Sequence, residues 1–283
     1  MARIPEGAER GPLTVAARRV LLDAIAALDE QREAVVLVGA QAVHLRTEHA
    51  DVGVAAFTSD GDLGIDRTRL KGEPHLDVVM EAAGFRQTPN QPGLWTRPER
   101  VGDVVVNIAV DLLVPEVFGG GGSRAARIPP HGRMAARKVS GLELVMVDND
   151  VRLIVSLEPE VDSRSAEIKV AGVAALLVAK AYKIRDRLAE GKPGREADKD
   201  AGDVMWLMAT SDVEAVAARF DELLTHPDVG SVAREGLSAM RAQFGAPRAQ
   251  GIEMAVGALA GSSLAEGTIR AVGPAFIANL NRR

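Results

Sequence analysis

Cysteine is absent from this 283-residue chain, and aromatic residues make up only 3% of it. The lack of cysteine excludes disulfide bonds, thiolate zinc sites and thiol nucleophiles, so any metal ligands must be oxygen atoms or histidine nitrogens. The five histidines show no spacing that is typical of a metal site. The shortage of aromatic rings leaves few side chains on which the bases of single-stranded nucleic acid could stack. Aliphatic residues must therefore pack the core.

The chain also lacks a hydrophobic run long enough to cross a membrane. Its longest apolar run covers residues 170–179, whereas a membrane-spanning helix needs about 20 residues. The first residues contain acids and proline where a signal peptide has its apolar segment. Acidic residues outnumber basic ones by 39 to 34, which argues against non-specific coating of nucleic acid. We expect a cytoplasmic globular protein with no membrane partner.

Two motifs of common catalytic sites are missing. The sequence has no Gly-x-Ser-x-Gly elbow and no Gly-Lys-Ser/Thr phosphate loop. The glycines at 119–122 lack the strand and helix that flank a dinucleotide-binding loop, so we interpret them as a flexible joint. These absences remove the sequence support for an α/β-hydrolase and for a P-loop enzyme.

The first part of the chain alternates predicted helices and strands. The patterns that indicate strands are a continuous apolar run at 34–38 that ends at Gly39, an alternating stretch at 57–65, and a β-branched run at 103–114 that Pro115 closes. Apolar spacing predicts helices at 13–28, 40–47 and 67–83.

The second part has a different character. Residues 117–142 contain the four glycines, two adjacent prolines and five basic residues without an acid, which is typical of a flexible, positively charged connector. Two short strands are expected near 142–147 and 151–155, and only helices beyond residue 168. We predict a core at 1–116, a connector at 117–165 and a helical domain at 166–283. The predicted helices cover residues 168–189, 197–209, 212–225 and 229–243, and a last one starts near 264.

Three aspartates carry the most specific chemistry of the sequence. Asp60 and Asp62 stand two residues apart, so a strand would place both carboxylates on one face, where they repel each other unless a cation lies between them. Asp111 ends a strongly apolar strand and needs a partner, which could be the same metal or an arginine. Carboxylate pairs of this kind suit Mg²⁺. Taken alone, the Asp-Gly-Asp segment could equally form a turn.

Two further features complete a possible phosphate site. Gly39 and Ala40 lie at a turn from strand to helix, where a phosphate can approach the free N–H groups of the first helical turn. Lys180 interrupts the apolar stripe of its own predicted helix, and a buried lysine needs a carboxylate or phosphate partner. Each of these two features also has a purely structural interpretation. Gly39 could serve only helix packing, and Lys180 could extend its ammonium to solvent.

In this order, Gly39-Ala40, Thr58-x-Asp60-x-Asp62 and Asp111 resemble the nucleotidyltransferase superfamily of DNA polymerase β type. More narrowly, the chain is similar to the toxin-like branch that includes the AbiEii and MenT proteins. The resemblance covers about residues 13–210 and implies an α+β fold, with a nucleotidyltransferase-type mixed sheet and flanking helices followed by a helical C-terminal half.

The resemblance also implies roles for individual residues. Asp60, Asp62 and Asp111 would hold two Mg²⁺ ions, and the nucleoside triphosphate (NTP) would contact Gly39, Ala40, Thr58, Lys180 and Lys183. The branch carries a lysine and a later aspartate in its second half, which Lys180 and Asp200 match, although Asp203 could fill the same role.

The implied reaction moves a nucleotide from the NTP to an acceptor hydroxyl. The acceptor would be RNA, such as a tRNA 3′ end, and the basic stretch from Arg124 to Lys138 could hold it. The protein would be the toxin of a toxin–antitoxin system with a cognate antitoxin. Two alternatives stay open, a transferase for aminoglycoside-like small molecules and a non-catalytic module that binds nucleotides and regulates a partner.

Overall fold

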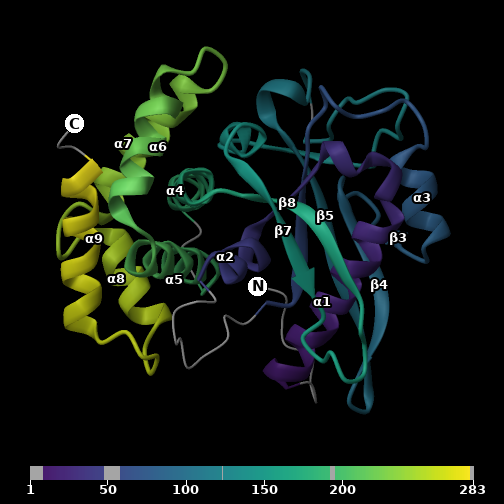
Figure 1. Cartoon of the computed structure of the whole chain (residues 1–283), viewed down its shortest axis with the longest axis horizontal. Coiled ribbons are helices and arrows are strands. Elements are labelled where there is room, and N and C mark those ends of the chain that lie inside the picture. Colours follow the sequence, from purple (N-terminus) through teal and green to yellow (C-terminus); the bar gives the residue numbers. More distant parts are fainter. Residues whose placement is uncertain (1–8, 48–57, 123, 192–194, 281–283) are drawn as a thin grey trace.

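The computed structural model describes residues 9–47, 58–122, 124–191 and 195–280. It has an α+β architecture, with one mixed sheet of eight strands followed by a run of helices (Figure 1). The α+β class predicted from the sequence is confirmed. Compared with the family that it resembles, the sequence also predicts an inserted loop at 48–56, and this segment lies outside the described residues.

The first part of the chain forms the middle of the sheet. Strand β1 is buried along its whole length, because β2 and β8 flank it and helices cover it, which explains its uninterrupted apolar sequence. Helix α1 lies across one face of the sheet, where it contacts β2, β4, β5 and β8. The elements of this part are α1 (Arg10–Ala27), the 3₁₀ helix η1 (Asp29–Ala34), β1 (Val35–Val38), α2 (Gly39–Thr47) and β2 (Asp60–Ile65).

The strands follow the order β3-β4-β5-β2-β1-β8-β7, with β6 paired to β5. Strands β2 and β5 are parallel, and Asp62 is in register with Asp111. Strand β1 runs antiparallel to β2 and parallel to β8. The elements that follow β2 are α3 (Leu76–Ala82), β3 (Arg86–Gln87), β4 (Leu94–Val101), β5 (Val104–Pro115), η2 (Glu116–Phe118), β6 (Arg137–Val139), η3 (Glu143–Met146), β7 (Asn149–Val155) and β8 (Ser165–Ala171).

Several predicted elements differ from the structure. The helix expected at 67–83 is reduced to α3, because Asp66 accepts hydrogen bonds from the backbone and hydroxyl of Thr68 in a turn, and Pro74 follows. The strand expected near 142–147 is the 3₁₀ helix η3. Residues 165–171 form strand β8 rather than the start of a helix, because Ile168 and Val170 alternate with polar residues. Strands β6 and β7 join the sheet from within the predicted connector.

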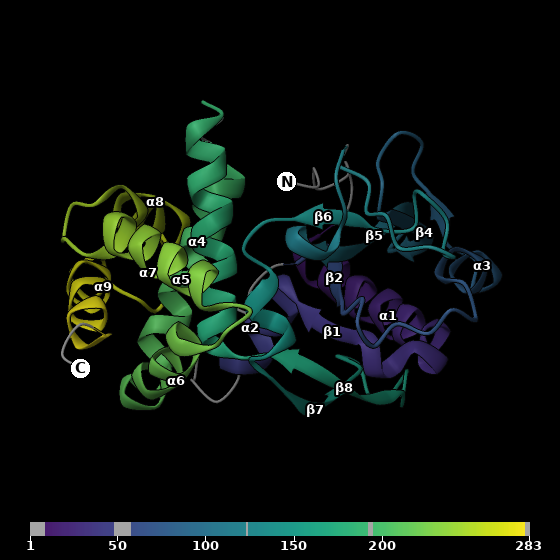
Figure 2. The ribbon, with the colours of Figure 1, turned by 90° about the horizontal axis from the view of Figure 1, so that it is seen from above.

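The C-terminal half consists of helices beside the sheet (Figures 1 and 2). Helix α2 lies between the two halves, since it contacts β1 and β2 on one side and α4 and α5 on the other. Within the described residues, no helix has the length and apolarity needed to cross a membrane. These helices are α4 (Val173–Ala189), α5 (Arg195–Thr210), α6 (Val213–Thr225), α7 (Gly230–Phe244), α8 (Gln250–Ala258), which the sequence patterns did not predict, and α9 (Glu266–Leu280).

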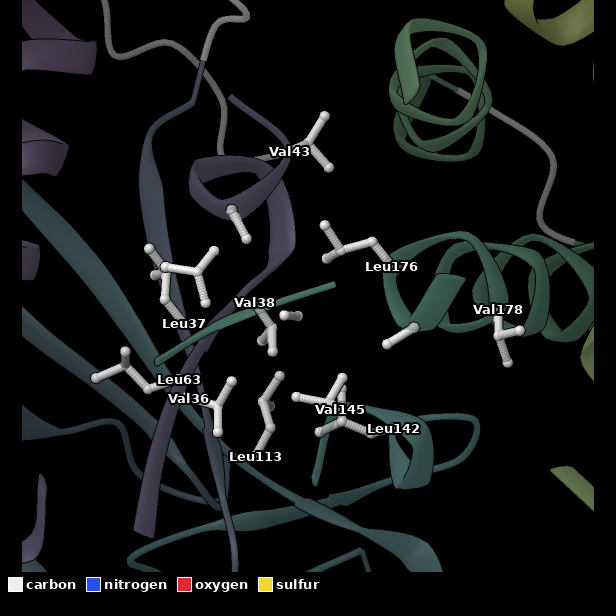
Figure 3. Packing of buried hydrophobic residues seen from close by; sticks show 14 of the residues in the cluster. Val36, Leu37, Val38, Val43, Leu63, Leu113, Leu142, Val145, Leu176 and Val178 are labelled. Carbon is white, nitrogen blue, oxygen red and sulfur yellow. The ribbon is translucent and has the colours of Figure 1, made fainter. Parts of the chain in front are cut away.

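One hydrophobic core runs through both halves. At their junction, side chains from the sheet, from η3 and from α4 gather in one place (Figure 3). This continuity fixes α4 relative to the ends of the central strands. The labelled side chains of Figure 3 are Val36, Leu37, Val38, Val43, Leu63, Leu113, Leu142, Val145, Leu176 and Val178.

The buried side chain of Asp148 joins the halves through polar contacts. Its Oδ2 accepts a hydrogen bond from the N–H of Ala175 at 2.8 Å, in the first turn of α4, and its Oδ1 accepts one from Nε of Arg219 on α6 at 3.0 Å. A carboxylate at a helix N-terminus is favourable because the unpaired N–H groups there carry partial positive charge. Asp148 therefore holds α4 and α6 against the end of the sheet.

Candidate active site

A cavity of about 680 Å³ opens between the ends of the central strands and helix α4. Its volume lies in the range typical of small-molecule sites, about 300–1,000 Å³. Strands β1, β2, β5 and β6, the N-terminus of α2, and helices α4 and α5 contribute its walls. Several residues predicted to be functional line it, namely Gly39, Ala40, Asp60, Asp62, Asp111, Lys180, Lys183 and Asp200.

The sheet brings the three predicted aspartates together. Asp60 and Asp62 lie two residues apart on β2, and Asp111 is the register partner of Asp62 on β5. Parallel register partners point to the same face of a sheet, as do residues i and i+2 of one strand. All three side chains therefore reach the cavity from one face.

Asp62 carries the strongest electrostatic conflict of the site. Burial raises the pKa of its carboxyl to about 7, and the negative charges of Asp60 and Asp111 act in the same direction. The ammonium groups of Lys183 and Lys180 oppose the rise. No described residue donates a hydrogen bond to this carboxylate. A cation beside Asp62 would favour its ionised form.

The turn before α2 is shaped around Asp62. Gly39 has a φ of +67°, in the left-handed region that disfavours side chains, and a Cβ added there would lie 2.0 Å from Oδ2 of Asp62. Glycine is thus required by both the backbone and the neighbouring carboxylate. Ala40 follows in the first turn of α2, where the backbone N–H groups have no partner within the helix.

Asp60 is oriented by neighbouring side chains. The hydroxyl of Thr58 donates to its Oδ1 at 2.9 Å, and Nε2 of Gln41 approaches its backbone carbonyl at 3.5 Å. Thr58 is 3% exposed and does not line the cavity, so the structure places it behind Asp60 rather than beside a ligand. Its contact with the NTP, expected from the resemblance, does not match this placement.

Asp111 forms a bidentate ion pair with Arg137. Nε of Arg137 donates to Oδ1 at 3.0 Å, and Nη2 donates to Oδ2 at 3.2 Å. Burial lowers the pKa of Arg137, but Asp111, with help from Asp62, more than reverses this and holds it above its usual value. Within the described part of the chain, no group of three or more acidic or His side chains is arranged to hold a metal. The role of Asp111 as a third metal ligand therefore stays a prediction, and the partner that the structure shows for it is Arg137.

Lys180 lies in a buried cluster of charges. Its ammonium contacts Oδ1 of Asp200 at 2.7 Å and Oδ2 of Asp203 at 2.6 Å. Burial alone would lower the pKa of Lys180, but these two carboxylates raise it well above its usual value. Asp200 also pairs with Lys183 and Arg187, and against the effect of burial its pKa is held far below the usual range by Lys180 and these neighbours. Lys180 and Asp200 are therefore both charged at neutral pH.

The sequence does not decide whether Asp200 or Asp203 matches the later aspartate of the family, and the structure distinguishes the two by their positions. Both contact Lys180, but of the two only Asp200 lines the cavity. The partner that Lys180 needs is a pair of carboxylates from α5 rather than a phosphate.

Basic side chains surround the remaining walls. Arg124, Arg137 and Lys138 come from the predicted connector, and Lys183 and Arg187 come from α4. The ammonium of Lys138 donates to the carbonyl oxygens of Gly120 and Gly122 at 2.8 and 3.2 Å, so it binds to the glycines that we expected to form a flexible joint. The walls also carry the acidic residues Glu116, Asp186 and Glu190, so both signs of charge stand around the three aspartates, and the basic members are available to a metal-bound polyanion.

Arg137 is the main site residue that sequence reasoning missed. The patterns showed it only as one of five basic residues in the connector. A possible arginine partner for Asp111 was foreseen, but not which arginine, since the two residues are 26 positions apart and meet only through the pairing of β5 with β6.

Comparison with models of known protein families and with curated protein sequences gives no match for this chain. Its function must therefore be argued from the geometry and charge of the cavity.

Proposed function

We propose that the cavity is the active site of a nucleotidyltransferase, which moves a nucleotide from an NTP to the hydroxyl of an acceptor. The observation that carries the proposal is the meeting of Asp60 and Asp62 with the N-terminus of α2 and with Lys183 in one cavity. The mixed sheet is also consistent with the nucleotidyltransferase fold that the sequence resembles.

Asp60 and Asp62 are the residues that would hold a divalent cation. The donor set fits Mg²⁺, since both are carboxylates. The pKa of Asp62 is raised chiefly by burial and then by the charges of Asp60 and Asp111, and a bound cation would oppose both effects. Asp111 is less suited to this role, because both its oxygens already accept from Arg137, whose positive charge disfavours a cation beside it. When bound, Mg²⁺ supplies charge neutralisation and makes an attacking hydroxyl more acidic.

The remaining residues would bind and orient the substrates. The N–H groups at the start of α2 face the cavity beside Gly39 and Ala40, and such groups bind phosphate well. Lys183 and Arg187 add positive charge on the opposite wall. Lys180 acts through Asp200, whose position it fixes. Catalysis of this type depends on placement and charge neutralisation more than on covalent chemistry.

The basic side chains of the cavity wall support a polyanionic acceptor. Arg124, Lys138 and Arg187 share this wall with Glu116, Asp186 and Glu190, and the basic residues can contact the phosphates of such an acceptor. We therefore propose RNA, such as a tRNA end, as the acceptor. The resemblance to the AbiEii and MenT proteins adds the proposal that the chain is the toxin of a toxin–antitoxin pair.

One observation favours a second function. The pairing of Asp111 with Arg137 leaves fewer free carboxylates than a two-metal transferase uses, as a nucleotide-binding module without catalysis would have. Such a module would bind NTP and release it unchanged.

The deciding experiment incubates the protein with Mg²⁺, each α-labelled NTP and total RNA, with an aminoglycoside in a parallel reaction. The matched variants are Asp60→Ala and Asp103→Ala, the latter removing a fully exposed carboxylate outside the cavity. The proposal predicts label in RNA with the wild type and with Asp103→Ala, and at least a hundredfold less with Asp60→Ala. Label in the aminoglycoside alone, or NTP binding without transfer, would refute RNA nucleotidyl transfer.

A further inference from the structure

The guanidinium of Arg137 is fixed at the floor of the cavity, beside the three carboxylates. Strand β6, which carries Arg137, pairs in parallel with β5, and Arg137 is in register with Leu113, two residues beyond Asp111. The side chain reaches back along β5 to form the bidentate contact with Asp111. Both partners are largely buried, at 22% and 16% exposure of their side chains.

The contact with Asp111 leaves donors of Arg137 available. Nε and one N–H of Nη2 face the carboxylate, while Nη1 has no partner among the described residues. A guanidinium carries five N–H donors in a rigid plane, so one edge can bind a carboxylate while another binds a phosphate. Arg137 lines the cavity and is therefore placed to use its second edge on a ligand.

The three carboxylates differ in their partners. Asp111 has Arg137, and one oxygen of Asp60 accepts from Thr58. The other oxygen of Asp60 and both oxygens of Asp62 accept no hydrogen bond from any described residue. The free oxygens are therefore adjacent on β2, where one cation can reach both residues, and the third carboxylate is already neutralised.

We propose that Arg137 takes the place of a second divalent cation. The site would bind one divalent ion, at Asp60 and Asp62, and Arg137 would contact a phosphate of the bound NTP. Asp111 is then a positioning residue, which holds the guanidinium in place and is not a metal ligand. This inference rests on the proposed function for the identity of the nucleotide, but not for the number of metal ions.

Charge balance supports a single ion. Before the substrate binds, Arg137 and one divalent ion together match the three negative charges of Asp60, Asp62 and Asp111. A second ion at Asp111 would have to share the carboxylate oxygens with the N–H groups of Arg137, and it would lie beside the positive guanidinium, which repels it.

The test uses Mn²⁺ as the metal probe and a non-hydrolysable ATP analogue as the nucleotide probe. Paramagnetic resonance counts the Mn²⁺ ions that bind per chain, and calorimetry measures the dissociation constant of the analogue with Mn²⁺ present. The variants are Asp62→Asn, Asp111→Asn, Arg137→Gln and Arg137→Lys. Arg100→Gln is the control, because the side chain of Arg100 is 77% exposed and does not line the cavity.

We expect one Mn²⁺ per wild-type chain, a loss of Mn²⁺ affinity of at least tenfold in Asp62→Asn, and a change of less than threefold in Asp111→Asn. Both Arg137→Gln and Asp111→Asn should weaken binding of the analogue about tenfold to a hundredfold, as expected for lost hydrogen bonds to a charged group. Arg137→Lys should bind the analogue as weakly as Arg137→Gln, because an ammonium lacks the two donor edges with which a guanidinium can contact Asp111 and a phosphate together. Arg100→Gln should change the affinity for the analogue less than threefold.

A double variant, Asp111→Asn with Arg137→Gln, keeps the test decisive if Arg137→Gln fails to fold. This double variant leaves neither partner of the buried ion pair charged, and it should bind Mn²⁺ like the wild type. Its affinity for the analogue should be reduced as much as in the single variants. Two Mn²⁺ ions per chain, one of them lost in Asp111→Asn, would overturn the proposal. So would unchanged affinity for the analogue in the double variant. If the wild type binds one Mn²⁺ but no nucleotide, the proposed function and the phosphate contact of Arg137 fail, while the statement that Asp111 is not a metal ligand stands.

Discussion

The carboxyl of Asp62 should make the stability of the metal-free protein fall as the pH rises. Its pKa is about 7 in the folded state against 3.8 as the ordinary value, chiefly because of burial and secondly because of Asp60 and Asp111. Between these pH values the folded state binds more protons than the unfolded chain, so the free energy of unfolding decreases as the pH rises through this window. At about 1.4 kcal/mol per pH unit, this group alone removes at most about 4 kcal/mol by pH 8.

Replacing Asp62 with Asn removes the titrating group with little change of shape. We expect Asp62→Asn to match the wild type at pH 4 and to exceed it by up to about 4 kcal/mol at pH 8. Urea denaturation in the presence of a chelator, at pH 4, 6 and 8, measures this difference. Asp103→Asn, which changes a fully exposed carboxylate, serves as the control and should follow the wild type at each pH.

The reasoning would be refuted if the stabilities of the wild type and Asp62→Asn stayed parallel from pH 4 to pH 8. A cation bound at Asp60 and Asp62 should oppose the loss, because it favours the ionised carboxylates. Millimolar Mg²⁺ should therefore raise the wild-type unfolding temperature more at pH 8 than at pH 5, and should leave Asp62→Asn nearly unchanged.

Three further predictions concern the scaffold, and urea denaturation at pH 7 measures each of them. Gly39→Ala should lower the free energy of unfolding by about 3 kcal/mol, because of backbone strain and the clash with the carboxylate of Asp62. Gly84→Ala, at a similar φ of +83° but in open space, should lower it by about 1 kcal/mol. Equal losses would show that Asp62 does not require glycine at position 39. Lys180→Met should lower the free energy of unfolding by about 3–5 kcal/mol, because it removes the ion-pair partner of buried Asp203 and one of the three partners of Asp200. Lys183→Met, with a side chain that is 48% exposed, should lower it by less than about 1 kcal/mol. Asp148→Ala should lower the free energy of unfolding by about 3 kcal/mol, because its hydrogen bonds to α4 and α6 are lost. Amide hydrogen exchange should become faster in α4 and α6 than in the rest of the chain. An equal increase throughout the chain would contradict the role of Asp148 in holding these helices against the sheet.

Local sequence patterns predicted the strands around the three aspartates of the cavity. The apolar run before Gly39 and the β-branched run before Pro115 are β1 and β5, since both are buried strands near the centre of the sheet. The alternation around Asp60 and Asp62 is β2. These patterns depend on burial of whole strand faces, which is encoded in neighbouring residues.

Pairings between distant residues were not predictable in the same way. The contact of Asp111 with Arg137 depends on the placement of β6 beside β5, and β6 has only three residues. Strand β8 was missed because its apolar residues run directly into those of α4, and the boundary at Gly172 depends on the packing of Asp148 against that glycine. Charge alone identified Lys180 as needing a partner, while the structure was needed to identify its two aspartates.

The most direct test of the central claim is a crystal structure of the protein with Mn²⁺ and a non-hydrolysable NTP. The account predicts an anomalous peak for manganese between the carboxylates of Asp60 and Asp62, with the triphosphate at the backbone N–H groups of Gly39 and Ala40. A nucleotide bound elsewhere, or a cavity in which Asp60 and Asp62 hold no ion at saturating Mn²⁺, would contradict the assignment of this cavity as a nucleotidyl-transfer site.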